Sequence, residues 1–168
     1  CRSFLEHDSR TWVQVNGEVN PDMLRNLGAV FNLHDLALED VINTGQRPKV
    51  ELYNNQVFII TTMPVYDGTR LELVQVSLFM GKNYLICLCP LAEDPFEPVR
   101  KRMRQTSIGP CRRRHILCLL YALLNLIVDA GFPVLKQFGD QLEDLEAELL
   151  ERPSQQTLSS IHRLKREL

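Results

Sequence analysis

Three runs rich in β-branched and aromatic residues follow one another along the chain, and they constrain the fold more than any other feature. The runs cover residues 57–63, 73–80 and 83–89, and their composition is typical of β-strands. The segments between them, 64–68 with Asp67-Gly68 and 81–83 with Gly-Lys-Asn, have turn chemistry. Neighbouring strands joined by short turns pair in the antiparallel sense. We therefore predict antiparallel hairpins in the middle of the chain.

Strand and helix signals flank these runs. Residues 11–15 have strand composition, and Asn20-Pro21 offers an N-cap followed by proline at the first helical position. Asp94-Pro95 repeats that signal before a basic helix. Strands interleaved with helices predict an α/β core.

From Arg112 onward the pattern is helical only. Residues 116–128 are apolar on nearly every helical face apart from Asn125, which predicts a helix buried between other elements. This run is shorter than the ~20 residues that a membrane span needs, so we expect no span in this chain. Gly131 and Pro133 should interrupt the helix. A heptad seam with acidic outer faces then predicts a long, projecting antiparallel helix pair; its members are Leu135, Phe138, Leu142, Leu145 and Leu149.

These patterns divide the chain into an α/β core, residues 1–114, and a helical part, residues 115–168. Within the helical part we expect the acidic projecting helix at about 134–151 and, after a break at Pro153, another helix over 154–168. The apolar stripe of that last helix has no stop signal before Leu168, so we expect the native protein to continue.

Composition excludes several classes of function. The net charge is −2, and the basic residues from Arg100 to Arg114 have no aromatic stacking platform beside them, which argues against a nucleic-acid partner. The five cysteines show no zinc-site spacing and indicate a reducing, cytosolic setting. Neither a glycine-rich phosphate loop nor a nucleophile motif is present, so we do not expect an enzyme.

The stretch from His34 to Asn55 carries the most unusual chemistry. A short helix should start at Asp35 and end before Gly45, with Leu33, Leu36 and Val41 on its apolar face. Glu39 and Asp40 would then lie near its C-terminus, where carboxylates oppose the helix dipole. Either Arg47 and Lys49, from the turn that follows, neutralise them, or another cation does.

Several motifs together closely resemble the cytoplasmic N-terminal domain of CorA-type magnesium and cobalt transport proteins, over nearly the whole chain from Thr11. The matching residues are Trp12, 38–40 (Leu-Glu-Asp), 46–51 (Gln-Arg-Pro-Lys-Val-Glu), 75–78 (Gln-Val-Ser-Leu), 96–100 (Phe-Glu-Pro-Val-Arg), 120–123 (Leu-Tyr-Ala-Leu), 128–129 (Val-Asp), 150–153 (Leu-Glu-Arg-Pro) and 164–166 (Leu-Lys-Arg).

The resemblance implies an α/β/α sandwich with a mixed, largely antiparallel sheet, followed by a long helical hairpin and a stalk helix beginning at Ser154. It also implies a homopentameric ion channel of the cell (inner) membrane, with this domain in the cytoplasm. The family's Gly-Met-Asn pore motif would lie beyond Leu168, so this polypeptide alone should transport nothing.

The same resemblance implies a regulatory divalent-cation site, with Mg²⁺ or Co²⁺ as the ion. Asp40 corresponds to a ligand that faces a neighbouring subunit, and Glu39 to a member of a second, weaker site. Asn125 and Asp129 correspond to acidic positions of that second site, which the neutral Asn125 should weaken. Bound metal would join the subunits and hold the pore shut.

Two other interpretations stay open. One is the cytoplasmic domain of a ZntB-like zinc transporter, which shares this architecture. The other is a soluble interaction module that binds a partner helix through the heptad seam.

Overall fold

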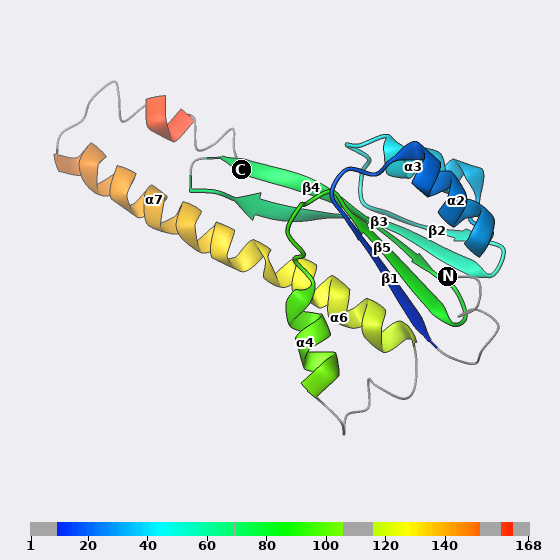
Figure 1. Cartoon of the computed structure of the whole chain (residues 1–168). Helices are drawn as coiled ribbons and strands as arrows, with labels where there is room; N and C mark the ends of the chain where they lie inside the picture. Colours follow the sequence, from blue (N-terminus) through cyan, green and yellow to red (C-terminus); the bar gives the residue numbers. More distant parts are fainter. Residues whose placement is uncertain (1–9, 69, 106–115, 152–158, 163–168) are drawn as a thin grey trace.

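The computed structural model describes residues 10–68, 70–105, 116–151 and 159–162. The strands are β1 Thr11–Asn16, β2 Lys49–Tyr53, β3 Gln56–Tyr66, β4 Leu71–Met80 and β5 Tyr84–Cys89. The helices are α2 Pro21–Phe31, α3 Asp35–Ile42, α4 Glu97–Gln105, α6 Ile116–Asp129 and α7 Gly131–Glu151 (Figure 1).

The strands form one mixed sheet in the order β1-β5-β4-β3-β2. β1 pairs with β5 in parallel, whereas the other three pairings are antiparallel. The three central runs thus form β3, β4 and β5 as consecutive antiparallel neighbours, as predicted. The fold is an α/β/α sandwich with a mixed, largely antiparallel sheet, followed by long helices.

One prediction about the central hairpin was wrong. The sequence predicts Pro64 in the turn after the first run, but this residue lies inside β3, opposite Leu73. The strand tolerates it because β2 pairs with β3 only as far as Ile60, so that Pro64 lies where β3 has an open edge. The turn comes later, where the Arg70 N–H donates to the Asp67 carboxylate (2.8 Å).

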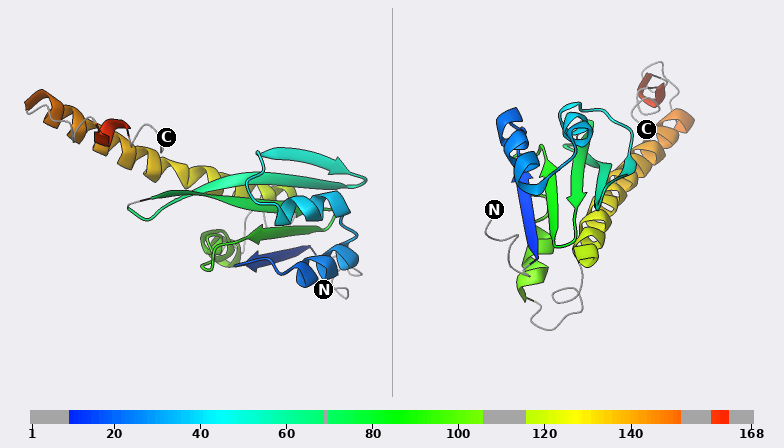
Figure 2. Two further views of the ribbon diagram at one scale, coloured as in Figure 1. Left: turned by 90° about the horizontal axis from the view of Figure 1, so that it is seen from above. Right: turned by 90° about the vertical axis from the view of Figure 1, so that its right-hand side faces the viewer.

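Each face of the sheet is covered by its own helices. α2 and α3 cover one face, with a core that includes Leu24, Phe31, Phe58, Phe79 and Ile86. α4 and α6 cover the other, and Figure 2 shows the two helical layers on opposite sides of the strands. The second core is built from sheet and helix residues that include Val76, Leu78, Leu85, Phe96, Leu119 and Leu123.

Helix α6 is less enclosed than its sequence predicts. Its sheet-facing residues are buried, Leu123 completely, but Tyr121 is 66% exposed and Val128 is 63% exposed. Among the described residues, α6 is therefore covered on one side only. The prediction of a helix buried between other elements was wrong, because an all-apolar sequence shows no preferred face until the neighbours are known.

α6 and α7 follow each other almost in line, with only Ala130 between them. The interruption predicted at Gly131 and Pro133 is thus slight. By length and composition alone the stretch Ile116–Leu150 could cross a membrane, a test that core helices also pass. The sheet covers one side of α6, the first part of this stretch. The division of the chain after residue 114 stays a prediction.

The seam predicted on α7 is only partly correct. Phe138 is buried with Val134 against Tyr66 and Leu71 of the β3–β4 hairpin, whereas Leu135 is exposed. The predicted break at Pro153 and the stalk beginning at Ser154 lie outside the described residues, of which 159–162 are helical.

Arg100, on helix α4, pairs with acidic residues that are near it in the sequence. The Arg100 guanidinium pairs with Asp94 (2.6 Å) and Glu97 (3.3 Å) and lies 5.0 Å above the Trp12 ring. Acidic residues of its own segment therefore neutralise Arg100, the first residue of the basic run from Arg100 to Arg114.

Candidate metal site on helix α3

Helix α3 begins where the sequence predicts. Asp35 is its first residue, and His34 is its N-cap, with the Leu36 N–H donating to Nδ1 of His34 (3.2 Å). Leu36 is an exception to the predicted apolar face, because it is 57% exposed while Ala37 and Val41 are buried. The helix is only eight residues long, so apolar burial alone fixes it weakly.

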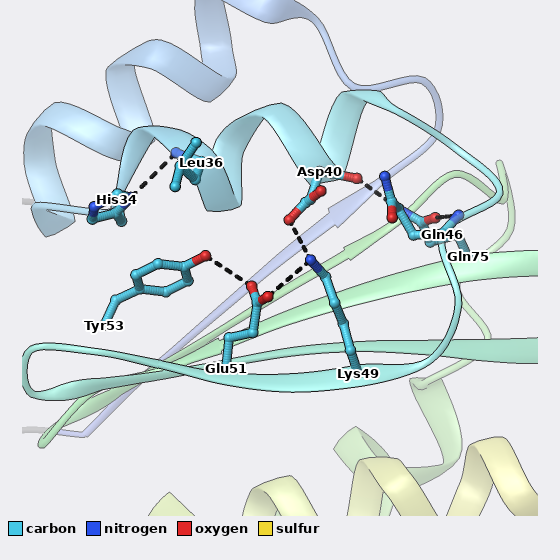
Figure 3. A network of polar contacts seen from close by, with 8 residues as sticks. All are labelled: His34, Leu36, Asp40, Gln46, Lys49, Glu51, Tyr53 and Gln75. Atoms are coloured by element: carbon cyan, nitrogen blue, oxygen red, sulfur yellow. Dashed lines mark hydrogen bonds and ion pairs between the residues drawn. The ribbon is translucent and has the colours of Figure 1, made fainter.

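Polar contacts hold the other end of α3. The Gln75 side-chain amide on β4 donates to the Asp40 carbonyl oxygen (3.0 Å) and accepts from the Gln46 N–H (3.2 Å). The chain then reverses through Gly45, whose φ of +92° suits glycine. These contacts position Asp40 above β2 (Figure 3).

Lys49 is the cation that neutralises Asp40. Its Nζ lies 2.7 Å from Oδ2 of Asp40 and 3.1 Å from Oε1 of Glu51, and the Tyr53 hydroxyl donates to the other oxygen of Glu51 (2.8 Å). Figure 3 shows the three β2 side chains in a row beneath α3. Of the two cations that the sequence offered, Arg47 precedes the strand and is exposed.

The hydrogen bonds shift the pKa values along this row. Hydrogen bonds to Asp40 and then Glu51 raise the pKa of Lys49. The Tyr53 hydroxyl and then Lys49 lower the pKa of Glu51. Both shifts favour the charged forms, so Lys49 and Glu51 are an ion pair at neutral pH.

Asp40 can still accept another cation. Its side chain is 19% exposed, and within the part of the chain that the structure describes its Oδ1 atom has no hydrogen-bond partner. Glu39 is exposed beside it. Mg²⁺ prefers oxygen ligands and keeps several waters, so the donor set fits a hydrated divalent ion held by Asp40, with Glu39 nearby.

The other two predicted ligands lie elsewhere. Asn125 and Asp129 are exposed on α6, one turn apart, and the sheet separates α6 from α3. One copy therefore does not bring the four residues together. Among the described residues there is no group of three or more His, Cys, Asp or Glu side chains that could hold a metal. The sequence prediction also gave no site role to Glu51, Tyr53 or Gln75, although the spacing of two along β2 places Lys49, Glu51 and Tyr53 on one face.

Comparisons with known proteins agree with this architecture. The cobalt/magnesium transport protein CorA of Thermotoga maritima is 39% identical over 167 residues, which are 98% of this chain but 47% of that protein. The solved soluble domain of CorA from Methanocaldococcus jannaschii has a TM-score of 0.74 at 20% identity, covering 93% of this chain and 61% of that one. The ZntB cytoplasmic domain from Vibrio parahaemolyticus has a TM-score of 0.59 at 15% identity, covering 92% and 60%. These two likenesses concern the fold alone.

The chain spans less than half the length of the curated relatives that it matches. The family described as CorA-like Mg²⁺ transporter protein matches residues 8–168. The chain therefore belongs to the family of CorA-like Mg²⁺ transporter proteins.

Proposed function

We propose that this chain is the cytoplasmic metal-sensing and gating domain of a magnesium and cobalt channel, with Asp40 as the principal ligand of a regulatory divalent cation. The observation that carries the proposal is the half-buried Asp40 carboxylate, positioned by Lys49 and Gln75 with its Oδ1 atom turned to no protein partner among the described residues. Family membership supports Mg²⁺ as the transported ion in this proposal, and the name of the relative from T. maritima supports Co²⁺ beside it.

The regulatory effect follows from charge. Carboxylates of neighbouring subunits repel when they approach within ~4 to 6 Å, and a divalent cation between them converts that repulsion into attraction. In a homopentamer, bound Mg²⁺ at Asp40 would join subunits and favour the closed state, and depletion would favour the open one. An intersubunit site also accounts for a ligand set that is incomplete within one copy.

Asn125 and Asp129 form a second, weaker site in this proposal, together with Glu39 of another copy. Their position on the opposite helical layer suits contact between copies, because both side chains are exposed. Asn125 supplies only a neutral carbonyl oxygen, which lowers the affinity for a divalent cation relative to a carboxylate.

The channel would lie in the cell membrane, through helices outside this chain, with this domain in the cytoplasm and no nucleic-acid partner. The family description names a transporter, in agreement with a non-enzymatic role. A ZntB-like zinc transporter and a soluble helix-binding module are the alternatives. Uptake assays with Mg²⁺, Co²⁺ and Zn²⁺ separate the first, and particle size with and without Mg²⁺ separates the second, since only a metal-joined oligomer depends on the ion.

Asp40→Ala in the full-length protein tests the proposal. Wild-type protein should become resistant to limited proteolysis as MgCl₂ is added, and the variant should lose most of that protection. Asp35→Ala is the matched control, because it removes an exposed carboxylate from the first turn of the same helix and should keep the protection. Unchanged protection of the Asp40→Ala protein would show that the site lies elsewhere.

A further inference from the structure

Lys49, on β2, places its ammonium group against Asp40, the carboxylate that we propose as the metal ligand. The Lys49 Nζ is 2.7 Å from Oδ2 of Asp40, at the distance of a charge-assisted hydrogen bond. A divalent cation bound to the same carboxylate would lie close to this ammonium group. The two positive charges repel, so Lys49 and the metal compete for Asp40.

Glu51 offers Lys49 a second place to bind. It already accepts from Nζ at 3.1 Å, and the Tyr53 hydroxyl fixes its other oxygen at 2.8 Å. The ammonium group can therefore turn away from Asp40 without becoming an unpaired charge, which would be costly at a side chain that is only 30% exposed. Figure 3 shows the Lys49 side chain extending from β2, with its Nζ atom between the carboxylates of Asp40 and Glu51.

We propose that Lys49 is a tethered competitor of the divalent cation at Asp40, and that Glu51 receives its ammonium group when the metal binds. The proposal rests on the function proposed above and adds its regulation. Lys49 sets how much Mg²⁺ is needed to occupy the site, because a metal that binds Asp40 repels its ammonium group and drives it towards Glu51. Glu51 is a positioning residue that acts through Lys49 and eases that displacement.

Opposite effects of two substitutions distinguish this role from a purely structural one. Lys49→Met keeps an unbranched side chain, one atom shorter, and removes the competing charge. It should therefore lower the MgCl₂ concentration for half-maximal protection of the full-length protein by about fivefold, the scale of a partly exposed ion pair. Glu51→Gln leaves Lys49 with Asp40 as its only carboxylate and should raise that concentration. If Glu51 acts through Lys49, Glu51→Gln should have little effect in the Lys49→Met protein.

Arg47→Gln is the control for net charge, since it removes a cation two residues away that is exposed and precedes the strand. It should shift the MgCl₂ midpoint by less than about twofold. Lys49→Gln provides a second variant in case the apolar methionine disturbs the strand.

The outcomes separate the two proposals. If Asp40→Ala keeps its Mg²⁺ protection, the metal site itself is wrong. If Asp40→Ala loses protection but neither Lys49 variant lowers the MgCl₂ midpoint, or Arg47→Gln lowers it equally, then only the competition by Lys49 is overturned. A lower midpoint in both Lys49 variants, absent in Arg47→Gln, supports it.

Discussion

The two faces of the sheet are covered in different ways, and the difference shows how each face can carry chemistry. α3 is short and buries only Ala37 and Val41, so Lys49 and Gln75 complete its attachment through polar contacts. α6 is fixed by five buried apolar residues. Asn125 and Asp129 lie on its exposed side and take no part in that packing. The Asp40 carboxylate on the α3 face is thus positioned by contacts from the sheet, whereas the positions of Asn125 and Asp129 depend on the helix backbone alone.

Truncation of one core residue on each face tests whether the two layers unfold together. Phe79→Ala removes a buried ring stacked on Phe58 at 4.5 Å, and Leu123→Ala removes a completely buried side chain of α6. Each should lower the free energy of unfolding by ~3 to 5 kcal/mol. Urea unfolding followed by circular dichroism measures the loss.

The control is Leu117→Ala, because Leu117 is on α6 but 55% exposed; it should cost less than about 1 kcal/mol. If Leu123→Ala instead produced a separate transition, with the sheet still folded, the two layers would be independent units. That result would support the division of the chain after residue 114.

Alkaline pH should weaken both faces, beginning with the α6 face. Burial raises the pKa of the Cys87 thiol above its ordinary value of 9.0, and burial raises the pKa of Tyr84, on the α2 face, from 10.0 to about 12. For both groups the folded pKa exceeds the unfolded one. Their contributions are therefore intact below pH 9.0 and 10.0 respectively, and are lost as the pH rises above those values.

Each group alone should cost up to ~1.4 kcal/mol per pH unit within its window. Urea unfolding between pH 7 and 11, with a reductant present, measures the slope. Cys87→Ala should flatten it from about pH 9, whereas Tyr84→Phe should flatten it only from about pH 10. Equal slopes for the wild type and both variants would contradict the burial of these groups.

The local features of the fold follow from the sequence. The hairpins of β3, β4 and β5, the helix after Asn20-Pro21 and the start of α3 all depend on turn residues, caps and β-branched runs within a few positions of one another. Such signals report the backbone directly. The prediction for Pro64 failed because proline is excluded only where a strand has hydrogen-bonded neighbours on both sides. The length of β2 determines which part of β3 has a second neighbour, and Pro64 lies beyond that part.

The partners across the fold could not be predicted in the same way. Lys49 and Arg47 are equally basic, and only the pairing of β2 beneath α3 selects Lys49 for Asp40. Likewise, the exposed side of α6 depends on which elements reach it. The family resemblance supplied four ligands: Asp40, Glu39, Asn125 and Asp129. Their assignment to metal stays a prediction. Because α3 and α6 lie on opposite faces of the sheet, all four residues could contribute to one site only through contacts between copies.

The smallest effect expected is a gain of affinity at the proposed weaker site. Asn125→Asp replaces an exposed neutral amide with a carboxylate one turn from Asp129. In the full-length protein, Co²⁺ or Mg²⁺ titration should then show a second binding phase tightened by about threefold, because a charge in this exposed setting is worth only ~1 kcal/mol or less. Asp129→Asn should weaken the same phase while leaving the phase that depends on Asp40 unchanged. If both substitutions instead changed the Asp40-dependent phase, the two faces would contribute to one metal site rather than two. The difference between Asp40, held by side chains of the sheet, and the solvent-exposed residues of α6 would then not correspond to two binding sites.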